Sequence, residues 1–145
     1  MLRVTARTCA GLGLCALAAA GLAACSSGPT SRAHGAIVHV TLRDFHIKVS
    51  RRHVDAGEVR LLVANKGPDT HELLIARTGA ALPLRKDGLT IDEERLEPVI
   101  VAEAEAEPPD SAHVVRLRLR PGRYELFCNM AGHYLGGMRA VMVVT

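Results

Sequence analysis

The sequence contains no tryptophan, and its other aromatic residues are only two phenylalanines and two tyrosines in 145 positions. A hydrophobic core must therefore be built mainly from valine, leucine and isoleucine. The sequence also shows no internal repeat and almost no helical periodicity. Its length suits one domain, because roughly a hundred residues are enough to bury a single core.

There is little excess charge of either sign, since 18 lysines and arginines face 15 aspartates and glutamates. Two of the basic residues, Arg3 and Arg7, belong to a predicted leader, so the mature domain is closer still to neutral. A dedicated nucleic-acid-binding domain would carry a strong basic excess. We therefore expect no nucleic-acid partner.

The first 24 residues have the pattern of an export signal. A short basic start is followed by a run of apolar and small residues and then by Leu22-Ala23-Ala24-Cys25. This ending resembles the bacterial lipoprotein signal, which implies cleavage before Cys25 and lipidation of that cysteine. The alternative is an ordinary secretory signal peptide cut at a nearby small-residue site. A transmembrane helix is disfavoured, because the apolar run is short and is interrupted by glycines.

Residues 25–35 are rich in Ser, Gly, Pro and Thr, which is typical of a flexible tether. The sequence thus divides into a signal peptide (1–24), a tether with lipidated Cys25 (25–35) and a folded domain (36–145). We expect an exported protein that is lipid-anchored to the cell membrane and faces the periplasm or the cell exterior.

Removal of the leader leaves Cys128 as the single thiol other than Cys25. An exported protein with one unpaired internal cysteine has no disulfide to account for it. Three interpretations are open: a reactive thiol, a metal ligand, or an inert buried cysteine.

Short runs of apolar residues, some of them alternating with polar ones, are separated by Gly and Pro turns and predict β-strands. The runs cover residues 36–49, 58–65, 71–76, 115–119, 124–128 and 139–145. A change of phase between Leu42 and Phe45 predicts a bulge or bend, after which Phe45, Ile47 and Val49 form one apolar face. The pattern predicts an all-β sandwich over residues 36–145.

A short helical or irregular insertion is expected around residues 85–110. Thr90 and Glu93 resemble a capping box that begins one or two helical turns. Residues 99–107 alternate alanine with glutamate, which indicates an exposed edge strand. We interpret the acidic character of residues 92–107 as a solvated face, with a docking patch as the alternative.

Cys128, His133 and Met138 are five residues apart in one predicted loop. A thiolate, an imidazole and a thioether form the soft ligand set that favours copper, and one more imidazole completes a Cys-His-His plane with a distant axial Met. His71, at the predicted entry to a strand, is the candidate. Separately, each residue has another interpretation: surface histidine for His71 and His133, and core for Met138. Met130 is a rival axial ligand, but it is only two residues from Cys128.

Three motifs together resemble the cupredoxins, small blue-copper electron carriers. They are Asn65-x-Gly67-x3-His71, Pro121-Gly122-x-Tyr124-x3-Cys128 and Cys128-x4-His133-x4-Met138, and the last spacing is similar to that of rusticyanin-like and sulfocyanin-like members. The resemblance implies a Greek-key β-sandwich that holds one type 1 copper ion through His71, Cys128, His133 and Met138. It also implies a monomeric protein that is not an enzyme and passes single electrons between a donor and an acceptor redox protein.

In that family the electron leaves through the exposed edge of the loop histidine, inside an apolar ring. In this chain the ring would consist of Met130, Ala131, Tyr134, Leu135 and Gly136. One departure from the family is Glu72, because many cupredoxins have Asn or Ser after the first histidine. A carboxylate near copper would favour the oxidised ion, unless the side chain points outward along the strand.

The alternative function is copper storage or delivery without redox turnover. Delivery sites usually contain paired cysteines or a Met/His-rich tail, and the sequence has neither. Multicopper oxidase chemistry needs a second copper site, but the sequence has no His-x-His pair and no histidine beside Cys128.

Overall fold

The protein is described by a computed structural model, which covers residues 35–145 apart from the side chains of Glu105 and Ala106. The predicted signal peptide, Cys25 and the tether up to residue 34 lie outside the described residues. Within residues 35–145, no helix is both long and apolar enough to span a membrane.

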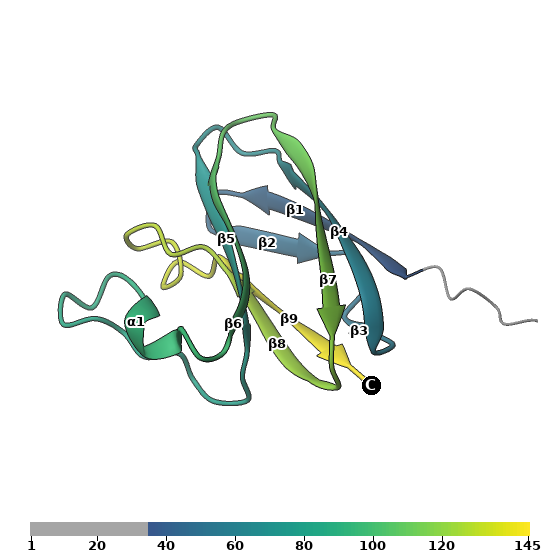
Figure 1. Ribbon diagram of the computed structural model, residues 1–145. Helices are drawn as coiled ribbons and strands as arrows, with labels where there is room; N and C mark the ends of the chain where they lie inside the picture. Colours follow the sequence, from purple (N-terminus) through teal and green to yellow (C-terminus); the bar gives the residue numbers. More distant parts are fainter. Residues whose placement is uncertain (1–34) are drawn as a thin grey trace, which may run out of the picture. The chain divides into compact units, whose positions relative to one another are not determined.

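The described residues form two β-sheets that face each other (Figure 1). The four-stranded sheet has the order β2-β1-β4-β7, with β1 Ala36–Arg43, β2 His46–Val49, β4 Gly57–Asn65 and β7 Ala112–Leu119. The five-stranded sheet has the order β3-β9-β8-β5-β6, with β3 His53–Val54, β5 His71–Arg77, β6 Ile100–Glu107, β8 Gly122–Phe127 and β9 Arg139–Val144. The pairs β1–β4 and β3–β9 are parallel, and the other pairs are antiparallel. The predicted all-β sandwich is confirmed.

The core between the sheets follows the alternation of the sequence. In β9, Ala140, Met142 and Val144 are buried while the residues between them are partly open. The largest group in this core is aliphatic, as the shortage of aromatic residues requires, and Tyr124 is the one tyrosine in it. The Tyr124 hydroxyl donates to the carbonyl of Arg120 at 2.8 Å, which joins the end of β7 to β8.

The change of phase in the first strand run is a tight hairpin turn. β1 and β2 pair antiparallel, and the pair Arg43 with His46 closes a turn formed by Asp44 and Phe45. The predicted bend is therefore confirmed. The expectation that Phe45 shares an apolar face with Ile47 is wrong, because Ile47 is buried whereas Phe45 is 51% exposed.

The predicted insertion is shorter than expected. Residues 100–107 form β6, an edge strand of the five-stranded sheet, which confirms the edge strand expected over residues 99–107. The irregular segment with its helix α1, Glu93–Leu96, therefore ends before residue 100. The helix N-cap is Asp92, which accepts a hydrogen bond from the backbone of Arg95, and the predicted capping role of Thr90 is wrong. The segment packs on the outer face of the sheet through a second apolar cluster, composed of Leu74, Ala76, Leu82, Ile91, Leu96, Phe127 and Tyr134.

The acidic stretch is not solvated throughout. Glu107, the last residue of β6, is only 7% exposed. Its carboxylate accepts a hydrogen bond from Ser111 Oγ at 3.1 Å and lies 3.0 Å from His113 Nδ1. For Glu107 the interpretation as a solvated face is therefore wrong.

The strand register brings three chain segments to one end of the sandwich. β1 ends at Arg43, β5 begins at His71, and β8 ends at Phe127, directly before Cys128. The loop between β8 and β9, yellow-green in Figure 1, leaves the sheet at this end. The described chain starts at the opposite end of β1.

Candidate metal centre

His71 is placed by a buried asparagine six residues earlier. Asn65 is fully buried, and its side-chain amide donates to the carbonyls of Asp69 at 2.7 Å and Glu107 at 2.8 Å. Its side-chain oxygen accepts from the backbone N–H of Gly67 at 2.9 Å. These bonds close the turn that delivers His71 to the first position of β5, as the sequence predicts.

The loop from Cys128 to Met138 is tied together by its own backbone. The N–H of Cys128 donates to the carbonyl of Met138 at 3.1 Å, and the N–H of Met138 donates to the carbonyl of His133 at 2.9 Å. The N–H of His133 in turn donates to the carbonyl of Met130 at 2.9 Å. The three predicted ligands of this loop are thus held at fixed separations by hydrogen bonds rather than by chain length alone.

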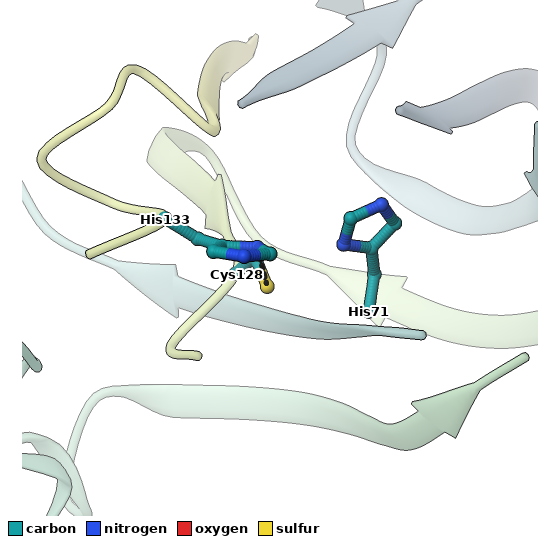
Figure 2. A group of neighbouring side chains, drawn as sticks. All are labelled: His71, Cys128 and His133. Atoms are coloured by element: carbon teal, nitrogen blue, oxygen red, sulfur yellow. Dashed lines mark hydrogen bonds between the residues drawn. The ribbon is translucent and has the colours of Figure 1, made fainter. Parts of the chain in front are cut away.

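His71, Cys128 and His133 converge at the end of the sandwich (Figure 2). One ligand atom from each residue lies within 4.8 Å of the other two. Cys128 Sγ is 3.6 Å from His133 Nδ1, and the two imidazole centroids are 5.3 Å apart. The fold therefore brings His71 and Cys128 together, as predicted, although more than fifty residues separate them in the sequence.

The two nitrogens of His71 have different surroundings. Nε2 is 3.1 Å from Asp44 Oδ1, whereas Nδ1 is buried and has no hydrogen-bond partner. Figure 2 shows the His71 ring turned toward Cys128 and His133. A buried polar atom without a partner is costly and uncommon. A metal ion held jointly by this nitrogen, the sulfur and the second imidazole would satisfy it, so the residues present fit a metal site.

Burial controls the protonation of these groups. Burial lowers the pKa of His71, and the nearby His133 lowers it further, so the neutral imidazole that can bind a metal is favoured. Burial raises the pKa of the Cys128 thiol, and backbone N–H groups of Glu72 and Met130 oppose that rise. Because a thiolate is the ligand form, a metal ion that binds here must displace a proton from Cys128.

Met138 is fully buried and packs in the main core cluster together with Cys128. Its backbone bonds to both Cys128 and His133 keep it next to the converging group. Met142 is equally buried in the last strand, as predicted, and Met130 is only partly buried. The chemistry of this set, two imidazoles, a thiolate and a thioether, matches one type 1 copper ion.

The predicted ring around His133 is only partly present. Leu135 is 53% exposed, and Ala131 and Gly136 are also exposed. The prediction for Tyr134 is wrong, because this residue is buried in the second apolar cluster. The centroid of its ring lies 5.8 Å from that of Phe127. Its hydroxyl donates to Glu125 Oε1 and accepts from the Arg139 guanidinium at 2.9 Å.

Asp44 and Phe45 were not predicted to take part in the site. Asp44 contacts His71, and the Phe45 ring lies 5.1 Å from the His133 ring, centroid to centroid. Asp44 has no signal in the local sequence pattern. Phe45 could have been noticed as one of only four aromatic residues, placed where the strand alternation changes phase.

Asn129, the residue after Cys128, was also missed. Its side chain accepts a hydrogen bond from the N–H of Ile91, and its amide donates to the carbonyl of Ile91 and to the Glu93 carboxylate. The N–H of Gly132 donates to the carbonyl of Leu89 at 3.0 Å. The segment before α1 thus braces the ligand loop from outside, a role that the sequence pattern did not indicate.

Glu72 contacts the site through its backbone N–H, which donates a hydrogen bond to Cys128 Sγ with an N···S distance of 3.5 Å. The Glu72 charge contributes to the raised pKa of the Cys128 thiol, but less than burial does. The departure at this position therefore keeps a hydrogen bond to the sulfur and adds a nearby negative charge.

Comparison with known proteins finds likeness at the level of structure. No family model and no curated protein matches the chain. Among solved structures, the dithionite-reduced auracyanin of Roseiflexus castenholzii aligns with a TM-score of 0.62 and 20% identity, over 77% of this chain and 99% of that one. Auracyanin B aligns with a TM-score of 0.58 and 23% identity, over 75% and 88% of the two chains. Reduced rusticyanin aligns with a TM-score of 0.58 and 20% identity, over 77% and 81%. The described domain therefore has the fold of auracyanin and rusticyanin, which is the cupredoxin β-sandwich.

Proposed function

We propose that this domain carries single electrons by means of one type 1 copper ion. His71, Cys128 and His133 would hold the ion, and Met138 would be a further, weaker ligand. The observation that carries the proposal is the buried, unpartnered Nδ1 of His71, a residue that brings one ligand atom within 4.8 Å of ligand atoms of Cys128 and His133.

The chain's own residues favour electron transfer over other uses of copper. When bound, copper supplies the change between two oxidation states. A site whose ligands are already fixed lowers the rearrangement that accompanies this change. Cys128 and Met138 are completely buried, and the loop hydrogen bonds hold them in place. Storage or delivery requires ligands that exchange readily, which a buried and braced set does not favour.

The similar structures support the same assignment. Rusticyanin is a copper protein, and both it and the Roseiflexus auracyanin have been crystallised in reduced forms. A shared fold does not by itself transfer a function. The proposal therefore depends on the site residues of this chain, and the fold supports it.

The direct test is the visible and electron paramagnetic resonance spectrum of the purified full chain loaded with Cu(II). We expect an intense thiolate-to-copper absorption band that disappears on reduction by ascorbate and returns on reoxidation, together with a narrow copper hyperfine splitting. Weak absorption and an ordinary tetragonal copper signal would contradict the proposal.

Met138 and Met142 provide a matched pair for the axial ligand. Both are fully buried methionines, and Met-to-Leu exchange conserves volume, so each change should cost less than about 1.5 kcal/mol of stability. Met138→Leu removes an electron-donating ligand, which disfavours the oxidised ion, so we expect a higher reduction potential and an altered copper spectrum. Met142→Leu should change neither. Equal effects of the two variants on the potential would exclude Met138 as the axial ligand.

We further propose that electrons pass through the exposed edge of His133 to a redox partner. The apolar surface beside it would be formed by Met130, Ala131, Leu135 and Gly136, without the buried Tyr134. Small interfaces of this kind suit weak and transient redox complexes between an electron donor or acceptor and a monomeric carrier.

Leu135→Glu tests this surface without an identified partner. In electron self-exchange, a reduced and an oxidised copy of the same protein must meet, so a carboxylate on both faces should repel. We expect self-exchange, measured by NMR line broadening, to slow by about tenfold or more while the copper spectrum is unchanged. Val101→Glu, which charges a 40% exposed side chain on the edge strand β6, is the control. Loss of the copper spectrum in Leu135→Glu would refute the separation between docking surface and metal site.

The cellular position is a separate proposal, supported by the sequence. We infer export and lipid anchoring through Cys25, which would keep the carrier at the outer face of the cytoplasmic membrane. Mass spectrometry of the mature N-terminus should find a diacylated Cys25, and Cys25→Ala should release the protein from the membrane fraction. A mature N-terminus that carries no lipid and results from cleavage after a nearby small residue would favour the ordinary secretory signal peptide.

A further inference from the structure

We propose that the turn formed by Asp44 and Phe45 is a positioning element for both imidazole ligands: Asp44 orients His71, and Phe45 packs over His133. This inference rests on the proposed metal site. The turn belongs to the four-stranded sheet, whereas His71 begins β5 and His133 lies in the loop before β9 of the five-stranded sheet. The turn therefore contacts the site across the gap between the two sheets.

The contact between Asp44 and His71 selects which ring nitrogen faces the metal. Asp44 Oδ1 lies 3.1 Å from Nε2. An ionised carboxylate can only accept a hydrogen bond, so this contact favours the tautomer with its proton on Nε2 and a lone pair on Nδ1. A carboxylate that receives the second N–H of a histidine is a common way to fix the tautomer and ring orientation of a metal ligand. The unpartnered Nδ1 is the nitrogen that this arrangement exposes to the site.

Gly67 makes the contact sterically possible. A Cβ at this position would lie 2.8 Å from Asp44 Oδ1 and 3.0 Å from His71 Nε2. Any larger residue would have to push the carboxylate or the ring aside. The Asn65 side chain also bonds the backbone N–H of Gly67, so the space around the contact is built by the same turn that delivers His71.

Phe45 is the second residue of the two-residue turn between β1 and β2, a position where a tight turn can require a positive φ. Its φ is +56°, a region that few residues other than glycine and asparagine enter, and its ring is 51% exposed. The ring is nevertheless placed against His133, with the two planes inclined at 52°. Gly136 leaves room for it, since a Cβ there would collide with the Phe45 ring.

Because Asp44 and Phe45 are adjacent, one short turn restrains two ligands that come from different parts of the chain. We therefore expect variants of Asp44 and variants of Phe45 to affect different ligands. Changes at Asp44 should alter the tautomer of the His71 ring, and changes at Phe45 should alter the mobility of the His133 ring.

The test for Asp44 begins with the metal-free full chain. Nitrogen-15 NMR should find His71 predominantly protonated on Nε2. Asp44→Ala should shift that tautomer population and weaken Cu(I) binding, measured against a chelator, by about tenfold or more. Asp44→Asn retains an acceptor oxygen and should restore most of the affinity, but loss of the negative charge should raise the reduction potential.

Asp69→Asn is the matched control for charge. Asp69 also acts electrostatically on His71, but it is exposed and the interaction is not a hydrogen bond to the ring. We expect this variant to leave the His71 tautomer and Cu(I) affinity unchanged. Equal tautomer populations in the original chain and Asp44→Ala would overturn the role of Asp44. A chain that shows the Nε2 tautomer but binds no copper would instead overturn the proposed function and leave the Asp44 contact standing.

The test for Phe45 is the mobility of the His133 ring, measured by nitrogen-15 relaxation in the Cu(I) form. Phe45→Ala should increase the ring motion of His133 and leave that of His71 unchanged, and Phe45→Leu should restore part of the order. Unchanged His133 motion in Phe45→Ala would overturn this half of the proposal.

Discussion

Cys128→Ser is expected to abolish the intense visible absorption of the copper-loaded protein almost completely. The band requires a thiolate bound to Cu(II), and a serine hydroxyl of nearly the same size cannot supply it. Because Cys128 is fully buried, the more polar hydroxyl loses its contact with water, and the N–H of Glu72 compensates only in part, so the free energy of unfolding of the metal-free protein should fall by about 1–3 kcal/mol. Absorption spectra, electron paramagnetic resonance and chemical denaturation of the metal-free chain measure the two effects separately.

Serine at position 128 also distinguishes the three interpretations of the lone thiol. An inert buried cysteine would show the small stability loss and no change in copper binding. If Cys128 were a reactive thiol that binds no metal, the original chain would show no copper band, and Cys128→Ser would only abolish labelling by thiol reagents. Only a metal ligand shows loss of the band with a fold that remains intact, as judged by the far-ultraviolet circular dichroism.

Asn65→Ala is expected to have the second largest effect, a loss of about 3 kcal/mol in the free energy of unfolding. The change removes three side-chain hydrogen bonds and leaves the carbonyls of Asp69 and Glu107 and the N–H of Gly67 without these partners. Each buried group left unsatisfied costs about 1–3 kcal/mol, although water can reach some of them in the variant. Chemical denaturation of the metal-free chain measures the loss, and copper affinity should fall with it because the turn before His71 is released.

Lys66→Ala is the neighbouring control. Lys66 forms an ion pair with Asp110 at 3.3 Å, but the two side chains are 48% and 88% exposed. Such surface pairs contribute little, so the change should stay within about 0.5 kcal/mol. If Asn65→Ala were as mild as Lys66→Ala, the bonds of Asn65 would not be what positions His71.

The sheet sandwich could be predicted because its signals are local. Alternating residues such as Val38, Val40 and Leu42 indicate a half-buried strand from their own neighbourhood, and their burial confirms it. The position of His71 at the start of a strand could be predicted for the same reason, because Gly67 and Pro68 within residues 65–69 are a turn signal directly before it. The same method placed Phe45 on an inward face, because alternation describes a strand and does not show where a two-residue turn reverses it.

The surface around His133 shows a second limit of local patterns. Tyr134 follows a loop histidine and was expected to lie in the exposed ring, but it turns inward between Phe127 and Arg139. Leu82 and Ile91, from the segment before α1, cover Tyr134 and make its surroundings apolar. The sequence around Tyr134 contains no trace of this cover, because the covering residues lie some forty positions earlier.

The sequence by itself determined the class of fold and the chemical identity of the candidate ligands, since strand alternation and the Cys128, His133 and Met138 spacing are properties of short segments. Tertiary structure decided what surrounds those ligands: the carboxylate of Asp44 on His71, the ring of Phe45 on His133, and the brace from Asn129 to Ile91. Each of these contacts joins residues that are far apart in the chain. The first two contacts depend on strand register and on the packing of one sheet against the other, and the third depends on the segment before α1 packing on the outer face of the five-stranded sheet. No local pattern of residues specifies these arrangements.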